Sequence, residues 1–533
     1  MNRLAKPALP CPSDPEPPLP TPPFPRSYWL IPGSVLCGRY PFRDDRREAE
    51  QVMRSLLQAG VRAFVDLTES HETGDGGLVW PYTDKARRIL RELGGDPAQL
   101  QFERFPVEDL SVPRTEGRAR AILRSLRRFR HQGMVSYLHC LGGRGRTGVA
   151  AGCLLADTCA LDGDEALSSL TRQWQACSVA ASSASPEFPR QREFVKRWAR
   201  PAVAWAERSR AALIGAAVGD ALGVPVEFRS RGQLRSDPVT GMRGFGSHHQ
   251  PAGTWSDDSS MIVATMRGFL QSGEADPAAA MAEFHRWSGE GAHTPHGRVF
   301  DIGGATSAAI SRFAAGQVAE HCGGTGEHSN GNGSLMRILP VALAHLDDPD
   351  LVGHASRMSA LTHAHERSRF CCAFACLVLA DLFHGGDIAG AIDFAWRVMD
   401  RRWDFSTNER AHFERLRPER LGQLGEHQVS GSGHVIDTLE SSLWVNLRHD
   451  NYRDAVLHAV NLGDDTDTTG CVAGAMAGLL HGEEAIPGDW RQTLVAGDEL
   501  AALGGDYGEW CRRRARQRWH DEVGRRSGVP AAR

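Results

Sequence analysis

Hydrophobic and polar positions follow two different patterns, and the change between them lies near residue 200. Before that point, short β-branched runs alternate with helical ones: residues 61–69 and 134–140 have the pattern of strands, and residues 83–93 and 117–133 that of helices. Strands that alternate with helices are typical of a parallel-type sheet flanked by helices. The pattern therefore predicts an α/β domain over residues 26–200.

After the change, apolar positions recur with helical spacing in Ala-rich and Leu-rich segments, and clusters of Gly and Asp separate them. This pattern predicts an all-α domain over residues 205–500, so the chain is expected to be multidomain. Residues 1–25 are rich in proline, which favours polyproline II and predicts a disordered leader. Residues 501–533 form a basic C-terminal segment, predicted to be a solvated helix or tail.

Composition narrows the classes of protein to consider. The 533 residues include Lys+Arg 61 and Asp+Glu 65, so the net charge of −4 gives no global basic field for nucleic acid. The longest apolar segment, residues 371–383, is too short to span a bilayer and contains Asp381. Twelve cysteines are scattered without a Cys-x-x-Cys pair, which fits a reducing compartment. We expect a soluble cytoplasmic protein with no membrane partner and no clear nucleic-acid binding.

One short segment of the α/β domain, YLHCLGGRGRTGV at residues 137–149, has the composition of a phosphate-binding loop. Cys140 and Arg146 are spaced as Cys-x5-Arg, between a predicted strand and a predicted helix. Backbone N–H groups, the positive helix N-terminus and the arginine would bind a phosphate dianion together, and they would lower the thiol pKa so that a thiolate attacks phosphorus. Gly142, Gly143 and Gly145 allow the backbone to approach that closely.

Two other interpretations of this loop fit less well. A nucleotide-binding loop of the Walker type needs Gly-Lys-Ser/Thr at the helix start, whereas this sequence has Gly-Arg-Thr. A buried structural cysteine beside a glycine turn explains neither Arg146 nor the strand and helix on either side.

With these residues in place, the segment resembles the cysteine-dependent tyrosine and dual-specificity phosphatases, whose loop reads His-Cys-x-x-Gly-x-x-Arg-Thr/Ser. The resemblance implies a phosphocysteine intermediate and no cofactor. By the same resemblance Asp109, in FPVEDLSVP, would protonate the leaving oxygen, and Gln191, in SPEFPRQREFV, would position the hydrolytic water. Thr147 would assist release of the thiolate, and His139 would brace the loop.

Two loop positions bear on the substrate of this first site. Gly142 stands where the commonest family loop has Ala, which leaves the class of phosphorylated substrate open. Arg144 either adds a second cation to the phosphate cradle or faces solvent.

The predicted helical domain contains four separated polar clusters, at residues 219–228, 253–261, 331–340 and 461–470. Adjacent carboxylates in Ser-Asp-Asp and Asp-x-Asp-Thr repel one another, and a bound cation would stabilise them. Hard oxygen ligands without Cys or His favour Mg²⁺ or Mn²⁺ over zinc.

Together these clusters resemble the ADP-ribosylglycohydrolases, the family of the dinitrogenase reductase activating glycohydrolase. The resemblance implies a site for two Mg²⁺ or Mn²⁺ ions, held by Glu227, Ser256, Asp257, Asp258, Asp465, Asp467 and Thr468. Asp301 would lie near the ribose, and either Asp301 or Glu227 would handle the proton. Asn332, Gly333 and Ser334 would wrap the diphosphate and ribose. His363 would lie at the adenosine side, or else is a histidine of the core.

The leading hypothesis is a bifunctional hydrolase that acts on a phosphorylated substrate and on an ADP-ribosylated protein or small ADP-ribose derivative. One alternative is that only one domain is active. Another is a non-catalytic reader of phosphate or ADP-ribose. Asp109, Cys140 and the Asp465/Asp467 pair favour catalysis, because binding alone does not require them.

Overall fold

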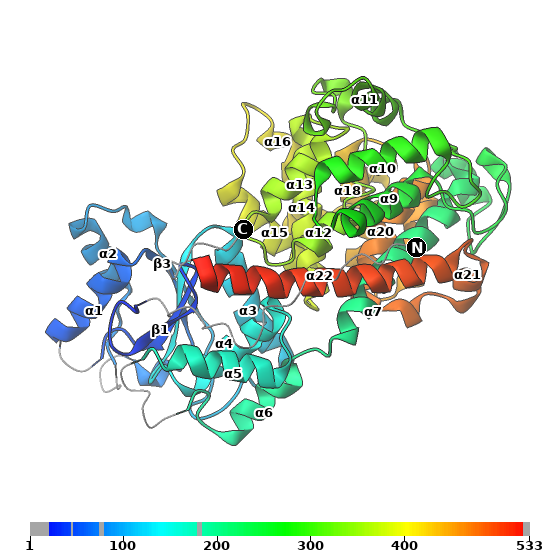
Figure 1. Ribbon diagram of the computed structural model, residues 1–533. Helices are drawn as coiled ribbons and strands as arrows, with labels where there is room; N and C mark the ends of the chain where they lie inside the picture. Colours follow the sequence, from blue (N-terminus) through cyan, green and yellow to red (C-terminus); the bar gives the residue numbers. More distant parts are fainter. Residues whose placement is uncertain (1–20, 44–45, 74–78, 178–183, 526–533) are drawn as a thin grey trace. The chain divides into compact units, whose positions relative to one another are not determined.

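The structure is a computed structural model that describes residues 21–43, 46–73, 79–177 and 184–525 (Figure 1). The chain divides into two compact units. The first unit consists of Met1–Arg118, Met134–Ala199 and Arg516–Arg533, and the second of Ala119–Gly133 and Arg200–Ala515.

A five-stranded sheet forms the centre of the first unit. Its strands are β1 (Ser27–Ile31), β2 (Val35–Arg39), β3 (Val61–Asp66), β4 (Gln101–Arg104) and β5 (Val135–Cys140), in the order β1-β2-β5-β3-β4. The predicted strands at residues 61–69 and 134–140 correspond to β3 and β5. The sheet is mixed, because β1 and β2 pair antiparallel while all other neighbours are parallel. A three-residue connection between β1 and β2 is too short for a parallel crossover.

Among the described residues, the helices between residues 26 and 200 are α1 (Arg46–Gln58), α2 (Thr83–Glu92), α3 (Glu116–His131), α4 (Gly145–Thr158), α5 (Gly163–Trp174) and α6 (Pro189–Trp198). Most of α3 is assigned to the second unit. Apolar residues of α1 and α2 pack with Phe64 and Tyr137 of the sheet into one buried cluster. On the strand β1, Tyr28 contacts Trp174 of α5 edge-on at 5.5 Å between ring centroids. The α/β prediction for this region is confirmed, including the two helices predicted from spacing.

The second unit is helical, as predicted. Its helices are α7 (Val203–Gly223), α8 (Arg231–Ser236), α9 (Asp257–Ser272), α10 (Pro277–Glu290), α11 (Gly304–Ala314), α12 (Leu339–Ala344), α13 (Leu351–Ala360), α14 (Glu366–Phe383), α15 (Ile388–Arg402), α16 (Arg410–Phe413), α17 (Pro418–Leu421), α18 (Val435–Arg448), α19 (Tyr452–Asn461), α20 (Thr466–His481) and α21 (Gly488–Thr493). The last helix, α22 (Gly497–Arg525), begins in this unit.

Helices α7 and α20 pack backbone against backbone. A Cβ atom at Gly219 would overlap the carbonyl oxygen of Gly470, and one at Gly474 would overlap the carbonyl oxygen of Gly215. Glycine therefore sets the distance between the two helices. Since residue numbers rise along one helix as they fall along the other, the pair is antiparallel.

Helix α7 is apolar because it is buried inside the protein along α20. Among the described residues, Pro189–Val226 is the one segment long and apolar enough to cross a membrane, and 94% of its apolar window is buried inside the protein. Burial of this extent is expected of a core helix, and α7 is packed along α20 as such a helix would be.

Both terminal segments contain ordered residues that the sequence pattern does not predict. The first 20 residues of the predicted leader lie outside the described part, but Phe24 is buried in the apolar cluster of the sheet. The predicted boundary at residue 501 falls inside α22, which buries Leu503, Tyr507 and Trp510 along one face. The Tyr507 hydroxyl donates to the carbonyl of Pro340 at 2.7 Å. Thus α22 is an amphipathic packing helix, rather than a solvated tail, over these residues.

The α7–α20 contact makes a prediction about stability. Helix propensity favours Ala over Gly, yet Gly219→Ala forces a Cβ into the backbone of α20 and should destabilise the protein by about 1–3 kcal/mol. The control is Gly505→Ala in α22, where no atom lies within 4 Å of the added Cβ. That change should stabilise the protein by about 0.5–1 kcal/mol. Urea unfolding followed by circular dichroism measures both, and equal effects of the same sign would contradict the close contact.

Candidate active sites

The phosphate-binding loop lies where the sequence places it. Cys140 is the last residue of β5 and Gly145 is the first residue of α4, so the loop joins a central strand to a helix N-terminus. Arg144 is the N-cap residue and does not cap the helix with its side chain. Gly143 has φ of 74°, and a Cβ there would overlap the backbone of Gly38 on β2. The tight turn of the loop therefore requires glycine at this position.

Arg146 is the charged centre of the first site. Its guanidinium is 2% exposed and donates to both carboxylate oxygens of Glu72, at 2.7 and 2.8 Å. A further donor reaches the Val107 carbonyl at 2.9 Å, and the same group pairs with Asp109 at 2.9 Å. Burial alone would raise the pKa of Glu72, but the hydrogen bonds from Arg146 outweigh it and hold that pKa below its usual value. Glu72 thus orients the arginine as a fixed cation.

Asp109 and Gln191 are both brought to this loop. Asp109 lies on an exposed turn with its carboxylate 2.9 Å from Arg146. Gln191 is fully buried, donates to the Ser111 carbonyl at 3.0 Å and lies 2.9 Å from the position of a Cβ on Gly145. The structure therefore places the predicted acid, the predicted water-positioning group and the cysteine loop together.

His139 and Thr147 are buried on either side of the cysteine. The Nε2 atom of His139 is 2.7 Å from the Tyr82 hydroxyl, and burial lowers the pKa of His139 to about 4. His139 is therefore neutral at physiological pH. The Thr147 hydroxyl is buried without a hydrogen-bond partner among the described residues. An unpartnered hydroxyl beside the loop fits a group that would donate to a thiolate.

The two variable positions of the loop differ in their surroundings. A Cβ at Gly142 meets no atom within 4 Å, so a larger residue such as Ala would fit at this position. Arg144 donates to the Ala184 carbonyl at 2.8 Å and pairs with Glu187 at 3.1 Å. Glu187 balances its charge, so Arg144 is neither an unpaired cation of the cradle nor a purely solvated side chain. Its role toward a substrate stays a prediction.

A second site lies where helices α7, α9 and α20 meet (Figure 1). Ser256 is the N-cap of α9 and Asp465 is the N-cap of α20, so six of the seven predicted metal ligands lie in or just before the first turns of two helices. Glu227 follows the 3-10 turn after α7. Positive helix ends stabilise carboxylates placed there. Hydroxyls support one of these carboxylates: Ser256 and Thr468 donate to the same Asp258 oxygen, at 3.0 and 3.3 Å.

Several carboxylate oxygens in this site are buried and lack hydrogen-bond partners among the described residues: Asp258 Oδ1, Asp465 Oδ1 and Asp467 Oδ2. Burial and then neighbouring carboxylates raise the pKa of Asp258 and Asp467 far above the usual value. Burial also raises the pKa of Glu227 to about 7. Unpaired buried carboxylate oxygens are costly unless they are protonated or bind a cation.

The ligand atoms form two groups that share one residue. The first group is Glu227, His248, Asp301 and Asp467, and the second is Asp220, Asp258 and Asp467. Within each group the candidate ligand atoms lie within 4.8 Å of one another. Carboxylate oxygens make up the whole second group and three of the four members of the first, and such ligands fit the Mg²⁺ or Mn²⁺ that the sequence implies. His248 adds one imidazole nitrogen to the first group.

Two members of these groups and Glu72 are not among the residues identified from sequence. Asp220 accepts from the backbone N–H groups of Ser256 and Ser259 at 2.9 and 3.0 Å, and from the Ser259 hydroxyl at 2.6 Å. It therefore anchors the first turn of α9. His248 forms a short hydrogen bond with Glu227, which raises the pKa of His248. Asp220 belongs to a cluster already visible in the sequence, whereas no motif singled out His248 or Glu72.

The predicted ADP-ribose residues separate into two sets. Asn332 donates to Asp465 at 3.0 Å, and Asp301 belongs to the first ligand group, so both lie at the metal site. Ser334 is fully buried, and its hydroxyl contacts Ser359 at 2.9 Å and Cys372 at 3.4 Å. That hydroxyl is therefore a core group in this structure and is not directed at a diphosphate.

His363 is likewise a buried residue, 3% exposed, with Nδ1 2.8 Å from the Thr362 hydroxyl. Burial lowers its pKa to about 3, so the ring is neutral. A Cβ on Gly333 would lie 2.9 Å from this imidazole, so His363 packs directly beneath the Gly333 backbone. The core alternative describes His363 in this structure.

Comparisons with known proteins find a match for each of the two regions of the chain. The family model "ADP-ribosylglycohydrolase" matches residues 201–519, and the model "Swiss Army Knife protein, DSP-PTPase phosphatase domain" matches residues 25–193. The "ADP-ribosylarginine hydrolase Tri1" of Pseudomonas putida (strain GB-1) is 32% identical over 301 residues, which cover 56% of this chain and 76% of that protein. The protein of the same name from Serratia proteamaculans (strain 568) is 30% identical over 299 residues, covering 56% and 78%.

A solved structure entitled "ADP-ribosylglycohydrolase-related protein complex" has 30% identity and a TM-score of 0.49, covering 58% of this chain and 99% of that one. The matched ranges adjoin near residue 200, where the hydrophobic pattern changes. The chain is therefore a hydrolase that belongs to the ADP-ribosylglycohydrolase family and has a DSP-PTPase phosphatase domain before the family region.

Proposed function

We propose that this chain is a bifunctional hydrolase with two separate sites. The acidic site hydrolyses the glycosidic bond of ADP-ribosyl substrates with two Mg²⁺ or Mn²⁺ ions. The Cys140 loop hydrolyses phosphomonoesters through a phosphocysteine. The observation that carries the first activity is the set of buried, unpartnered carboxylate oxygens on Asp258, Asp465 and Asp467.

Two ions, rather than one, are supported by the arrangement of the ligands. Asp467 belongs to both ligand groups, so the two groups adjoin and their residues would hold the ions side by side. Ser256 and Thr468 hold Asp258 in position, and Asn332 holds Asp465. When bound, the ions would supply positive charge that holds the ribose hydroxyls and a water and favours departure of the leaving group.

Either Glu227 or Asp301 would transfer the proton in the reaction at this site. Burial raises the pKa of Glu227 in the metal-free site, and the same carboxylate belongs to the first ligand group, next to where the ribose would bind. His248 hydrogen bonds to Glu227 and fixes its orientation. Asp301 adopts φ of 51° in the loop before α11, which brings its carboxylate to the same group.

The phosphatase steps use residues that the structure brings to one loop. The Sγ of Cys140 attacks phosphorus, an S–P bond forms, and the P–O bond breaks as Asp109 gives its proton to the leaving oxygen. Arg146 binds the phosphoryl oxygens while Glu72 keeps its guanidinium in place. Water positioned by Gln191 then attacks phosphorus as it gives a proton to the Asp109 carboxylate, and the S–P bond breaks to release the thiolate, which Thr147 stabilises.

We propose an ADP-ribosylated protein or a small ADP-ribose derivative as the substrate of the second unit. Two relatives are named ADP-ribosylarginine hydrolases, so an arginine linkage is the first to assay. We also propose a cytoplasmic location, on the scattered cysteines of the sequence. The eleven cysteines within the described residues are all free and buried, which supports it.

Exchange of one residue in each site should separate the two activities. Cys140→Ser should abolish hydrolysis of an aryl phosphate and spare release of ADP-ribose from ADP-ribosylarginine, because only the first reaction needs a thiolate. Asp467→Ala should do the reverse, and EDTA should reproduce only this second pattern. Loss of both activities from either change would instead indicate one composite site. Loss of neither, with bound phosphate and ADP-ribose detected, would support a reader protein.

The candidate metal site predicts that one substitution has opposite effects on stability without and with metal. Asp467→Asn removes one carboxylate from a buried group of like charges, so in EDTA at pH 8 it should stabilise the protein by about 0.5–2 kcal/mol. The same change should remove the rise in Tm that Mg²⁺ or Mn²⁺ gives to the unaltered protein. Differential scanning fluorimetry with and without metal measures both. A variant that is less stable in EDTA yet still stabilised by metal would exclude Asp467 as a ligand.

The pairing of Glu72 with Arg146 predicts that a change at Glu72 lowers phosphatase activity, because the arginine is no longer held in position. Glu72→Gln keeps the shape of the side chain but removes the charge that holds Arg146, so kcat/KM for an aryl phosphate should fall about 10- to 100-fold. Glycohydrolase activity of the same sample reports on folding and should be unchanged. Wild-type phosphatase kinetics in the variant would show that Arg146 is oriented without Glu72.

A further inference from the structure

Two exposed phenylalanines lie on the loops between α7 and α9. Phe228 is 71% and Phe245 is 65% exposed, and no other Phe, Trp or Tyr among the described residues is exposed to this extent. Both adopt positive φ, 66° at Phe228 and 68° at Phe245. Bulky residues rarely adopt the left-handed region, and those that do are concentrated where ligands bind. The surroundings of the two rings therefore bear on the neighbouring site.

The Phe228 ring is one end of an aromatic row, formed by Phe228, His248 and Phe300. The ring centroids are 5.8 Å apart between Phe228 and His248, and 5.4 Å apart between His248 and Phe300. Each member adjoins a carboxylate of the first ligand group. Phe228 follows Glu227 in the chain, Phe300 precedes Asp301, and His248 hydrogen bonds to Glu227. The row thus borders the two carboxylates proposed for proton transfer.

Backbone hydrogen bonds hold Phe228 in its exposed position. The Phe228 N–H donates to the Asp464 carbonyl at 2.7 Å, and the Asp464 N–H donates to the Arg229 carbonyl at 2.8 Å. On the other side, the Ser247 hydroxyl donates to the Glu227 carbonyl at 2.6 Å. The backbone before and after the ring is therefore fixed, so little ordering is needed when a ligand binds to it.

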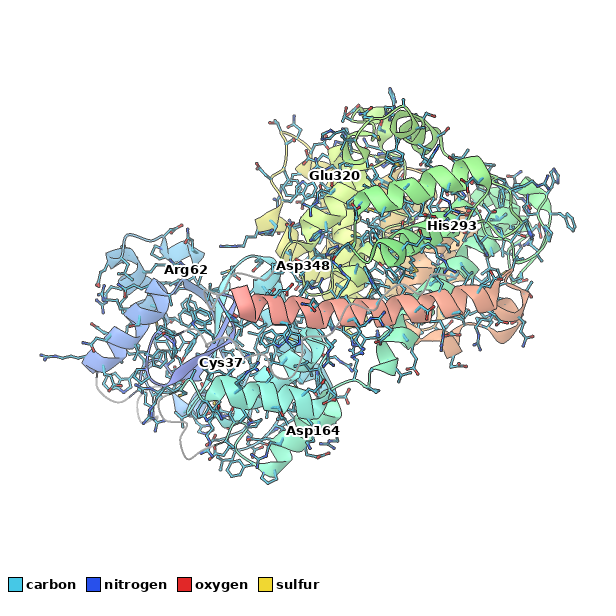
Figure 2. All side chains as sticks on the ribbon, in the orientation of Figure 1. Cys37, Arg62, Asp164, His293, Glu320 and Asp348 are labelled. Atoms are coloured by element: carbon cyan, nitrogen blue, oxygen red, sulfur yellow. The ribbon has the colours of Figure 1, made fainter. Side chains whose placement is uncertain are left out.

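The connection between α10 and α11 holds the other end of the row. His293, labelled in Figure 2, lies near the start of this connection, and its Nε2 is 2.6 Å from a carboxylate oxygen of Glu283 on α10. Farther along, the Nε2 of His296 is 2.9 Å from the Thr254 hydroxyl. Phe300 is therefore on a connection that two side-chain contacts tie to neighbouring elements.

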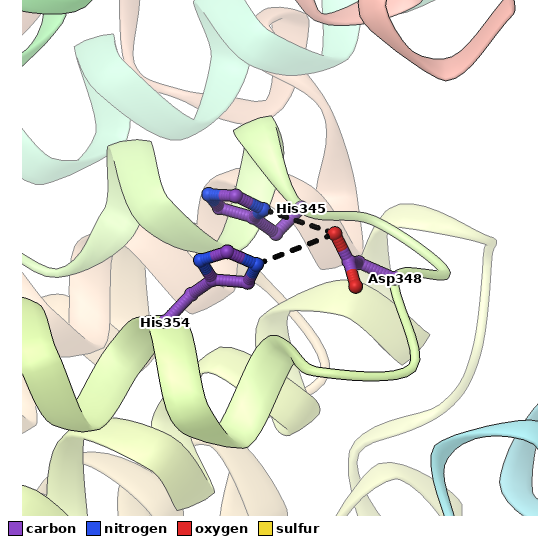
Figure 3. A group of neighbouring side chains, drawn as sticks. All are labelled: His345, Asp348 and His354. Carbon is purple, nitrogen blue, oxygen red and sulfur yellow. Dashed lines mark hydrogen bonds and ion pairs between the residues drawn. The ribbon is translucent and has the colours of Figure 1, made fainter. Parts of the chain in front are cut away.

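A second aromatic group in the same unit is satisfied by its own polar partners. The rings of His345 and His354 stack with centroids 3.6 Å apart, and Asp348 Oδ2 lies 3.3 and 3.4 Å from their nitrogens (Figure 3). The NH2 group of Arg357 lies 2.8 Å from His354 Nδ1. Protein groups satisfy this cluster, and we assign no ligand to it.

Other surface rings of the unit have an arginine of the chain over one face. The guanidinium carbon of Arg410 is 4.9 Å from the ring centroid of half-buried Phe405, and that of Arg369 is 6.0 Å from Trp403. No arginine or lysine of the described residues lies over the Phe228 ring. Phe228 therefore offers an aromatic face to a cation from outside the chain.

The charge beside the row is negative. The carboxylates of the acidic site are Asp220, Glu227, Asp257, Asp258, Asp301, Asp465 and Asp467. They outnumber the positive charges of two divalent ions, so the site stays negative when both ions are bound, with or without a proton on His248. A guanidinium is planar, always charged and weakly hydrated, and it stacks on aromatic faces. Charge and shape therefore both fit a guanidinium.

We propose that Phe228 is a specificity-determining residue, whose ring stacks on the guanidinium of the arginine from which ADP-ribose is released. The proposal rests on the proposed glycohydrolase function. Glu227 or Asp301 transfers the proton between ribose and leaving group, so the leaving group lies beside the carboxylates that the row borders.

The test is steady-state hydrolysis of ADP-ribosylarginine by the full chain in saturating Mg²⁺. Phe228→Leu keeps an apolar side chain and removes the π face, so kcat/KM should fall about 5- to 30-fold. Phe228→Trp keeps an aromatic face and should stay within about 3-fold of the wild-type kcat/KM, because indole binds cations at least as well as phenyl.

Controls separate the leaving group from the nucleotide and from folding. ADP-ribose contains adenine and lacks the guanidinium, so its Kd from isothermal titration calorimetry should be the same for Phe228→Leu as for wild type. Phe245→Leu changes an equally exposed phenylalanine at equally positive φ, outside the row, and should hydrolyse ADP-ribosylarginine like wild type. The Tm shift with Mg²⁺ should be the same in all variants.

The outcomes that overturn the proposal differ from those that overturn the activity. Wild-type kcat/KM in Phe228→Leu would exclude the stacking, as would an equal fall in Phe228→Trp or in Phe245→Leu. An equal loss of ADP-ribose affinity would assign the ring to adenine instead. A wild-type chain that releases ADP-ribose from a serine linkage but not from arginine would keep the glycohydrolase function and exclude this role of Phe228. Release from no linkage would overturn both.

Discussion

Contact between the backbones of α7 and α20 is the constraint on which the acidic site depends. A Cβ at Gly223, the last residue of α7, would overlap the backbone of Asp467 in the first turn of α20. One turn earlier on α7, Asp220 accepts the backbone N–H groups that begin α9. Three helix ends are thus fixed to one another by glycine contacts and one carboxylate. Carboxylates that repel one another can then be held in place, because the helices cannot move apart without losing this packing.

The two sites use the helix N-terminus in opposite ways. At the Cys140 loop, the N-terminus of α4 and Arg146 together present positive charge to an anionic substrate. At the acidic site, the N-termini of α9 and α20 stabilise the protein's own carboxylates, and these in turn attract cations. Each arrangement also has a fixed polar partner: the Glu72 carboxylate for Arg146, and two neutral hydroxyl donors for Asp258. The positive end of a helix would therefore bind an anionic substrate in one unit and stabilise the carboxylates of the candidate metal site in the other.

The sequence predicts the parts of this structure in which local pattern and chemistry agree. Strands β3 and β5, the Cys140 loop and the two Asp-rich helix starts are all predicted, because each joins a strong pattern to residues with few other uses. Glu72 and His248 are not, since each acts through a partner distant in sequence: Arg146 for Glu72, and Glu227 for His248. Ser334 and His363 are buried in this structure, which for His363 is the core alternative that the sequence leaves open, and their roles toward ADP-ribose stay predictions. Their motif is present, but hydrogen bonds to Ser359 and Thr362 place their side chains in the core.

With metal bound as proposed, the stability of the second unit would depend on that metal, whereas the resemblance of the phosphatase loop implies no cofactor there. Without cations, burial and mutual repulsion raise the pKa values of Asp257, Asp258 and Asp467, so folding has to protonate or strain this cluster. In the Cys140 loop the charges of Arg146, Glu72 and Asp109 pair with one another. If the proposed ions bind, a fall in divalent metal would weaken the packing of α7, α9 and α20 and leave the Arg146 pairs unchanged. Metal supply would then act on one activity of this chain and not on the other.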